Sequence, residues 1–499
     1  MLSPRRRSGA RQFALARIAS VCASASWFGN TADNTAFANE AGARGREVTR
    51  FSICKRFGQQ HRDPLMHVNC CNDERRMRES AAMATKKKVA AVDPLSAFSK
   101  SRNTPKVSGK RFASGEHTWL GNAGAQLAAQ QLRKSGIGVD DETFLNVSRL
   151  SGDTHFEYGE LVALSGDFYA SPSELYEEVP ATLPTPMRAN DLKKLRELFA
   201  VELEWIGDRQ HGRGGDAYPD TNVSAAWNAK SYVELALRNV DHFGWHNVVA
   251  YVRHHAVAMK LAASANGEDD ERWQRALVYN AFADHFLTDG FAAGHLRVPR
   301  AEIIEWAATQ NYSAKLAGIL SKVLHDQDGH VTSLHGEHSK GEGLRVTNAK
   351  GADWLTFCDG QLFLFPGATD RDEVKQPVLA VAASLGELVR AWKTGELPER
   401  TYAALDFVPF PHPKELGLAE KFAKWPTARI DALVKSCAFY AKVPWLGAGL
   451  KREHVVALIK ALPALMKRFG ENVKNACEEN AELQARIPKA YLKAYQSIR

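Results

Sequence analysis

The stretch Asn280-Ala-Phe-Ala-Asp-His-Phe-Leu-Thr-Asp-Gly-Phe-Ala-Ala-Gly-His295 decides how this chain of 499 residues is interpreted. Within it, His285 and Asp289 are four residues apart, so on a helix they share one face, with Cβ atoms about 5–6 Å apart. Apolar residues surround the pair on nearly every side, which is typical of a buried helix. A buried imidazole and a buried carboxylate need partners, and a divalent cation satisfies both. The alternative is a histidine–aspartate pair hydrogen-bonded within an ordinary core.

His295 lies ten residues after His285 in this stretch. On a straight helix that separation turns its side chain roughly 80° away from the pair. Gly290 and Gly294 lie between them and can loosen the helix. We therefore expect His295 to bind a neighbouring ion instead of the same one.

Three more residues of metal-ligand type precede this stretch. His117 lies in the first turn of a predicted helix, Asp167 follows a short predicted helix, and His242 lies in Asn-Val-Asp-His-Phe-Gly. A lone histidine is more often an ordinary core or surface residue. Together, however, the three lie on or beside apolar helical segments in front of the paired motif.

Most of the remaining chain from about Ser114 has a helical pattern. The predicted helices are Glu116–Lys134, Tyr158–Ser165, one starting at Ser171-Pro172, Ala189–Glu204, Ala225–Asp241, Trp245–Ala265, Glu271–Asp289, Ile303–Leu324, Val378–Lys393, Lys421–Ala441, Lys451–Gly470 and a last helix in the closing residues. Gly329–Asp359 is rich in Gly, His and Asp, and should be irregular with a small hairpin formed by Leu344–Val346 and Trp354–Phe357. These patterns predict an all-α architecture.

The order His117, Asp167, His242, His285, Asp289, His295 resembles the zinc-dependent phospholipase C and S1/P1 nuclease superfamily. That family's motif is a histidine, an aspartate four residues later and a histidine six residues further, and all three positions match here. The resemblance covers roughly residues 117 to 342. It implies a multi-helix bundle with a small irregular insert, holding roughly two to three zinc ions.

The resemblance also assigns individual ligands. One zinc ion would be held by His242, His285, Asp289 and Asp167, and Asp289 would also reach a second ion together with His117. Bound Zn²⁺ lowers the pKa of its water toward about 7, and a metal pair can clamp the attacking and leaving oxygens of a phosphodiester. Asp167 would be the catalytic residue that orients or deprotonates the water.

A third ion would be held by His295 with a later ligand, for which two candidates remain open. His338 and Glu342 have the family spacing of a histidine followed four residues later by a carboxylate. His325 directly follows an amphipathic helix, and a ligand on a helix is held more rigidly than one on a Gly-rich loop. We therefore favour His325.

The chain departs from the family before His117. The family uses the amino group and carbonyl of a processed N-terminal tryptophan as ligands, whereas here 116 residues precede His117 and no tryptophan lies just upstream. Without cleavage near Lys110, the ion shared with His117 would lack that ligand. A site with two metals would then remain.

Charge and composition limit the substrate and the domain plan. The first 88 residues hold 17 Lys and Arg against 7 Asp and Glu, so the rest of the chain carries about −2 of the formal +8. We predict a phosphodiester substrate, with a phospholipid favoured, and we expect no stable nucleic-acid complex and no transmembrane segment. The alternatives are an S1/P1-type single-strand nuclease and a non-catalytic helical protein with a structural metal site.

The predicted domain plan has three parts. Residues 1–96 form a disordered or targeting extension, with a possible true start at Met83, because they combine excess positive charge with no periodic apolar pattern. Residues 97–345 form the metal-binding helical domain, and residues 346–499 a helical region packed on it. The odd, widely spaced cysteines of the body favour a reducing compartment, so we expect a cytoplasmic protein, or one exported by an unrecognised signal.

Overall fold

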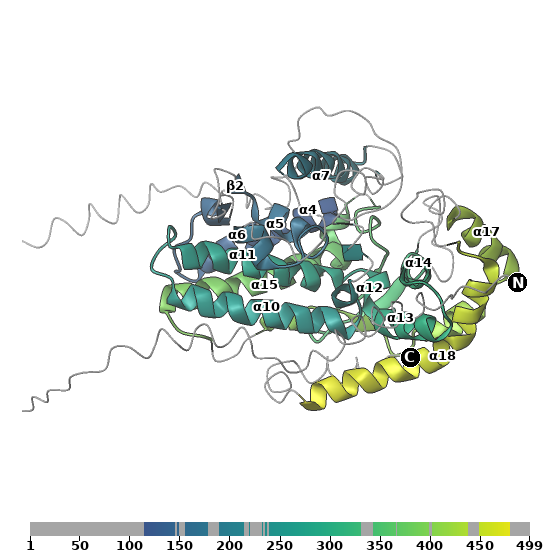
Figure 1. The fold of residues 1–499 in the computed structure, drawn as a ribbon. Helices are drawn as coiled ribbons and strands as arrows, with labels where there is room; N and C mark the ends of the chain where they lie inside the picture. Colours follow the sequence, from purple (N-terminus) through teal and green to yellow (C-terminus); the bar gives the residue numbers. More distant parts are fainter. Residues whose placement is uncertain are drawn as a thin grey trace, which may run out of the picture. The chain divides into compact units, whose positions relative to one another are not determined.

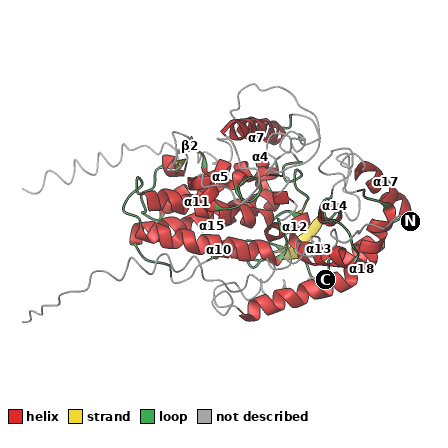
Figure 2. Cartoon of the chain, viewed as in Figure 1, coloured by secondary structure: helices red, strands yellow, loops and turns green. Residues whose placement is uncertain are grey.

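The structure is a computed structural model of the chain. It describes residues 114–144, 147–148, 155–177, 189–213, 219, 232, 235–236, 239–330, 343–365, 367–398, 402–437 and 449–479. The chain divides into two units, Met1–Lys87 and Lys88–Arg499, and every described residue belongs to the second. Figure 2 shows that this part is mostly helical, which confirms the predicted all-α class.

Four helices form the centre of the fold: α4 (Ser114–Lys134), α10 (Trp245–Ser264), α11 (Glu271–Asp289) and α15 (Asp372–Thr394). In Figure 1, α10, α11 and α15 run side by side, and α4 packs against α15. Their buried faces are apolar, as in the stacking of Trp273 of α11 on Trp392 of α15 at 4.2 Å between ring centroids. The bounds of α11 agree with the sequence prediction.

A close contact between two glycines brings α4 and the short helix α5 (Tyr158–Leu164) together. A Cβ atom on Gly121 would lie 2.7 Å from the Cα atom of Gly159, and one on Gly159 would lie 2.0 Å from the carbonyl oxygen of Thr118. Any larger residue here would push the helices apart. The contact therefore places the start of α5 against the first turns of α4, where His117 lies.

The other helical elements surround this centre. They are η3 (Asp141–Phe144), α6 (Pro172–Glu177), α7 (Ala189–Gln210), η4 (Val240–His242), α12 (Ala293–Arg297), α13 (Arg300–Thr309), α14 (Ala314–His325), η5 (Ala368–Asp370), η6 (Ala403–Asp406), α16 (Leu418–Ala423), α17 (Thr427–Cys437) and α18 (Arg452–Glu479). The predicted helix Ala225–Asp241 falls mostly outside the described residues, as does the one predicted for the closing residues.

Two predicted helices are each interrupted, which corrects the sequence analysis. Ile303–Leu324 is two helices, because Asn311 has a left-handed φ of 57° and the Ser313 side chain caps a new start by accepting from Leu316 N. Lys421–Ala441 is likewise divided between α16 and α17, and Pro426, which has no backbone N–H to donate, lies between the two helices. In both cases the helical spacing of apolar residues continues across the break, so the sequence pattern predicted one helix where there are two.

The strands are few and short. β1 (Val147–Ser148) pairs with β2 (His155–Phe156), and β4 (Asp353–Thr356), β3 (Leu344–Thr347) and β5 (Phe410–Pro411) form a second antiparallel sheet in that order. In the β3–β4 hairpin Leu344 pairs with Thr356, which confirms the hairpin predicted within the irregular segment. The chain leaves β4 directly toward Asp359. None of the helices that the structure describes has the length and apolar character needed to cross a membrane.

Candidate metal centre

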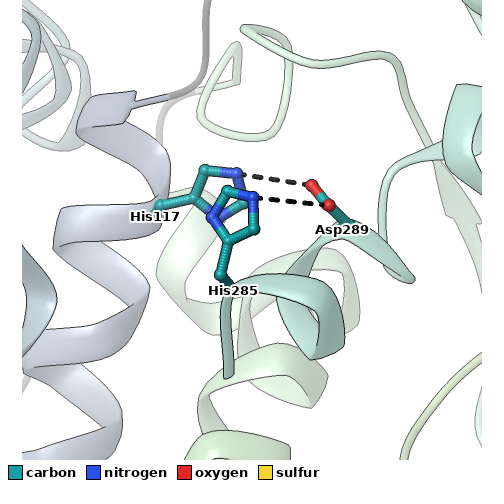
Figure 3. A group of neighbouring side chains, drawn as sticks. All are labelled: His117, His285 and Asp289. Carbon is teal, nitrogen blue, oxygen red and sulfur yellow. Dashed lines mark ion pairs between the residues drawn. The ribbon is translucent and has the colours of Figure 1, made fainter. Parts of the chain in front are cut away.

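Five of the predicted ligands converge in what we call the inner cluster: His117, Asp167, His242, His285 and Asp289. They come from α4, the turn after α5, η4 and α11, and each is at most 7% exposed. Figure 3 shows His117 and His285, from α4 and α11, both directed at the carboxylate of Asp289. The cluster contains two groups of potential ligand atoms lying within 4.8 Å of one another: His117, His285 and Asp289, and Asp167, His242 and His285.

Asp289 is the common centre of these contacts. Its Oδ1 atom lies 3.5 Å from His117 Nε2, and its Oδ2 atom lies 2.8 Å from His242 Nδ1 and 3.7 Å from His285 Nε2. The imidazoles are also close to each other, since His285 Nε2 and His242 Nδ1 are 3.3 Å apart. Asp289 therefore presents both carboxylate oxygens to nitrogen atoms from three separate elements.

The Nδ1 atoms of His117 and His285 are hydrogen-bonded to groups outside the inner cluster. His285 Nδ1 is 2.9 Å from the carbonyl oxygen of Val162, so it must donate its hydrogen there. His117 Nδ1 is 2.8 Å from Thr288 Oγ1, and that hydroxyl donates to the backbone carbonyl of Asp284 or His285. The hydroxyl therefore accepts from His117 Nδ1–H. Both histidines thus turn the lone pair of Nε2 inward, the arrangement that orients histidine ligands in metal sites.

The turn carrying Asp167 fits closely against this cluster. Gly166 has a φ of 73°, and a Cβ atom there would lie 2.8 Å from His285 Cδ2 and 3.1 Å from His242 Cε1. Only glycine combines this left-handed conformation with such close approach to the two rings. The conformation of Gly166 therefore brings Asp167 to the edge of the imidazoles.

Three further residues form what we call the outer cluster: His295, His325 and Asp359. Asp359 Oδ2 lies 3.1 Å from His295 Nε2 and 2.9 Å from His325 Nε2. In these two histidines as well, Nδ1 is hydrogen-bonded to a group outside the cluster. His295 Nδ1 donates to the carbonyl oxygen of His242 at 2.7 Å, and His325 Nδ1 donates to Asp326 Oδ1 at 2.9 Å. The two clusters meet where His295 Nε2 lies 3.9 Å from Asp289 Oδ1.

Several contacts fix the outer cluster from outside. The buried Asp328 carboxylate accepts from Arg297 Nε at 2.8 Å and from Lys421 Nζ at 2.9 Å, which ties α12 to the turn after His325. A Cβ atom on Gly294 would lie 2.5 Å from His325 Cδ2, so α12 approaches this ring as closely as a glycine allows. The ring of Phe243 stacks on His295 with centroids 4.7 Å apart.

Burial and charge shift the pKa values of the cluster in opposite directions. Burial raises the pKa of the Asp167 carboxyl to about 6, although His242 opposes the shift. Burial also favours the neutral carboxyls of Asp289 and Asp359, but the neighbouring histidines outweigh it and hold both pKa values well below the usual range. For His295, burial opposes protonation, yet Asp289 and Asp359 raise its pKa to about 10. A group of buried carboxylates that require positive charge nearby is the electrostatic setting of a cation site.

Two buried atoms of the site have no hydrogen-bond partner within the described part of the chain: Asp289 Oδ2 and His325 Nε2. His242 Nδ1 lies 2.8 Å from Asp289 Oδ2, and Asp359 Oδ2 lies 2.9 Å from His325 Nε2, but neither contact has the angles of a hydrogen bond. Buried polar atoms are otherwise almost always hydrogen-bonded, and a site for an ion is one explanation for exceptions. The nitrogen and carboxylate donors, with two inward atoms unpartnered, fit a divalent metal of zinc type.

All seven ligand positions selected from the sequence lie in these two clusters. The structure brings His325 to His295, as favoured, whereas His338 and Glu342 lie outside the described residues. Sequence analysis missed Asp359, which stands in a Cys-Asp-Gly turn at the end of the segment predicted to be irregular. Its only sequence signal was an acidic residue before glycine in a Gly-, His- and Asp-rich segment.

Comparisons of the chain with protein-family models, with curated proteins and with solved structures found no match.

Proposed function

We propose that this protein is a zinc-dependent phosphoric ester hydrolase of the phospholipase C and S1/P1 nuclease type. The observation that carries the proposal is that four of the five histidines have their Nδ1 atoms engaged outside the site and their Nε2 atoms directed at shared carboxylates. These four are His117, His285, His295 and His325. A hydrogen-bonded core pair needs no such arrangement. Four imidazoles aligned in this way are expected where the inner nitrogens bind cations.

The ligand sets suggest roughly two to three ions. His117, His285 and Asp289 would hold one, and Asp167 and His242 with the shared His285 or Asp289 would hold a second. His295, His325 and Asp359 would hold a third. Bound Zn²⁺ would supply Lewis acidity toward the phosphoryl oxygens and activate water for attack.

The chain's own residues would orient the reaction. Asp167 stands at the rim of the inner cluster on a turn fixed by Gly166, so its carboxylate is placed to accept a proton from water or to orient it. The Asp359 side chain is 22% exposed and that of His325 12%, whereas the Asp289 side chain is 4% exposed. The outer cluster is therefore the side from which an ester would enter.

We favour a phospholipid head group over nucleic acid as the substrate. The chain after its first 88 residues carries a formal charge of about −2, which offers no net attraction to a polyanion. The burial of the inner cluster favours a second candidate, a purely structural metal site without catalysis, because structural sites are closed to solvent.

Elemental analysis combined with a hydrolysis assay tests the proposal. Protein expressed with zinc should contain about two to three equivalents and should cleave a generic phosphodiester, with inhibition by chelators. A side-by-side assay at low salt should show faster cleavage of phosphatidylcholine than of single-stranded DNA, and the reverse would favour the nuclease. Zinc-loaded protein inactive on both would favour the structural site, and less than about one equivalent of any divalent metal would reject the proposal.

The role of Asp167 has its own test. An Asp167→Asn variant should lower kcat more than it raises KM, because the residue would act on water and not on substrate binding. A change confined to KM would assign Asp167 to the substrate cleft.

A further inference from the structure

The turn carrying Asp359 is held by a carboxylate that no metal ligand set uses. Glu116, in the first turn of α4, is 4% exposed. Its Oε2 atom accepts from Gly360 N at 2.8 Å and its Oε1 atom from Leu362 N at 3.0 Å. Both oxygens of one buried side chain therefore bind the backbone immediately after Asp359.

Glu116 directly precedes His117, a member of the inner cluster. The first turn of α4 thus contacts both clusters: His117 reaches Asp289 at 3.5 Å, and Glu116 fixes the turn of Asp359. The turn itself has little regular structure of its own, since it follows β4 and contains Gly360 with a left-handed φ of 69°. On its other side the Cys358 thiol donates to the carbonyl oxygen of Asp328 at 3.3 Å.

We propose that Glu116 is a positioning residue that sets the place of Asp359 and thereby couples the outer metal subsite to the inner one. This inference rests on the function proposed above. If α4 shifts with the ion held by His117, the Asp359 turn shifts with it. Two hydrogen bonds from a helix thus support a ligand that is carried by a loop.

A glutamine at this position would break the arrangement in a defined way. A carboxamide has one acceptor oxygen, and its NH₂ group would face one of the two backbone N–H donors. One hydrogen bond would be lost and a donor–donor contact created, which displaces the turn while leaving side-chain volume unchanged.

The chain contains a matched control for this substitution. Glu387 of α15 is also 4% exposed, and its oxygens accept from Tyr402 N at 2.9 Å and Ala403 N at 3.0 Å. It thus makes the same two-amide contact to another loop, and it also pairs with His255 at 3.0 Å. Glu387 is part of neither cluster, so Glu387→Gln reports the general cost of disrupting such a contact.

Zinc titration of the full-length chain tests the inference. Glu116→Gln should weaken the ion bound at the outer cluster by about 10–100-fold, the usual effect of removing an outer-shell support, and leave the others bound. Glu387→Gln should lower thermal stability without changing any zinc affinity. If both variants lose stability and neither changes zinc binding, Glu116 is only structural and the inference fails while the proposed function stands. Wild-type protein that binds no zinc rejects both.

A double-mutant cycle shows whether Glu116 acts through Asp359. In an Asp359→Asn background, Glu116→Gln should change outer-ion affinity no further, because the ligand it places is gone. Fully additive effects would overturn the proposal. Should Glu116→Gln not fold, Glu116→Asp replaces it in the same cycle, since its shorter carboxylate cannot reach both amides.

Discussion

The inner and outer clusters are built from the same residue types but are held in different ways. The inner cluster takes two of its ligands, His285 and Asp289, from successive turns of one buried helix. The outer cluster draws one ligand each from α12, the end of α14 and the turn after β4, and depends on Arg297, Asp328 and Glu116 to align them. Helical spacing alone explains much of the first, whereas the second exists only through contacts between distant segments.

The largest effect should come from Asp289, where the two clusters meet. Asp289→Asn should reduce hydrolysis by more than about 100-fold, the upper limit for outer-shell changes, and remove zinc from the inner cluster. The reason is that its carboxylate oxygens lie within 3.7 Å of His117 Nε2, His242 Nδ1 and His285 Nε2. Metal analysis and a phosphodiesterase assay measure this loss, and thermal melting should fall with it.

Asp270→Asn is the control for that change. Asp270 caps the other end of α11 by accepting from Arg272 N, and an asparagine oxygen can accept the same bond, so this change should cost little stability and no zinc. Unchanged metal content and melting in Asp289→Asn would show that the clusters are ordinary core contacts.

A smaller effect, confined to the outer cluster, is expected from Asp328→Asn. Removing one partner of a buried ion pair costs about 3–5 kcal/mol, because Arg297 is then left buried without compensation. Urea unfolding measures the cost, and zinc titration should show weakening only at the outer cluster. Equal weakening of all ions would mean that the two clusters are not separately supported.

The same ion pair predicts a pH dependence. Burial disfavours the charged Asp328, but Arg297 and Lys421 outweigh it and hold its pKa well below the ordinary value. A depressed pKa in the folded state gives stability that is present above the unfolded pKa of about 3.9 and lost as pH falls below it. In chelator-treated protein, the stability difference between wild type and Asp328→Asn should be constant from about pH 7 to 5 and shrink below about pH 4. A difference that stays constant to the lowest pH would contradict this.

For the inner cluster, the sharper probe is Gly166→Ala. The left-handed backbone costs a non-glycine residue about 1–2 kcal/mol, and the Cβ contact at 2.8 Å with His285 should add a further penalty and weaken zinc binding. Gly136→Ala is matched, because Gly136 has a φ of 80° and a Cβ atom there would meet nothing within 4 Å. Melting and zinc titration of both variants separate backbone strain from the ring contact. Identical behaviour would mean that the inner rings can move aside freely.

The smallest effect is expected from deleting residues 1–96. All ligands of both clusters lie after residue 114, and the deleted residues have no periodic apolar pattern that would offset the entropy of folding. Zinc content and melting temperature should match those of the full chain. Loss of an ion on deletion would show that the inner cluster receives a ligand from this region.

The sequence by itself determined the helical class, the bounds of α11 and seven of the eight residues in the two clusters. The helical class and the pair His285 and Asp289 could be predicted because a buried helix repeats its apolar residues at a fixed period, and residues four apart on it share a face. The other five positions came from the resemblance to a family whose order of ligands this sequence matches. The periodicity does not register local breaks. For this reason the interruptions at Asn311 and Pro426 emerged only in the structure, although both are explained by backbone conformation once seen.

Only the tertiary structure decided that Asp359 joins His295 and His325, and that Glu116 holds its turn. Glu116 and Leu362 are 246 residues apart in the chain, and no local pattern encodes their contact. Their meeting follows from the packing of α4 against the other helices and from the hairpin that ends just before Asp359. An irregular turn has no repeating sequence pattern from which its position could be predicted. The position of Asp359 therefore depends on the distant groups that accept hydrogen bonds from the backbone amides of its turn.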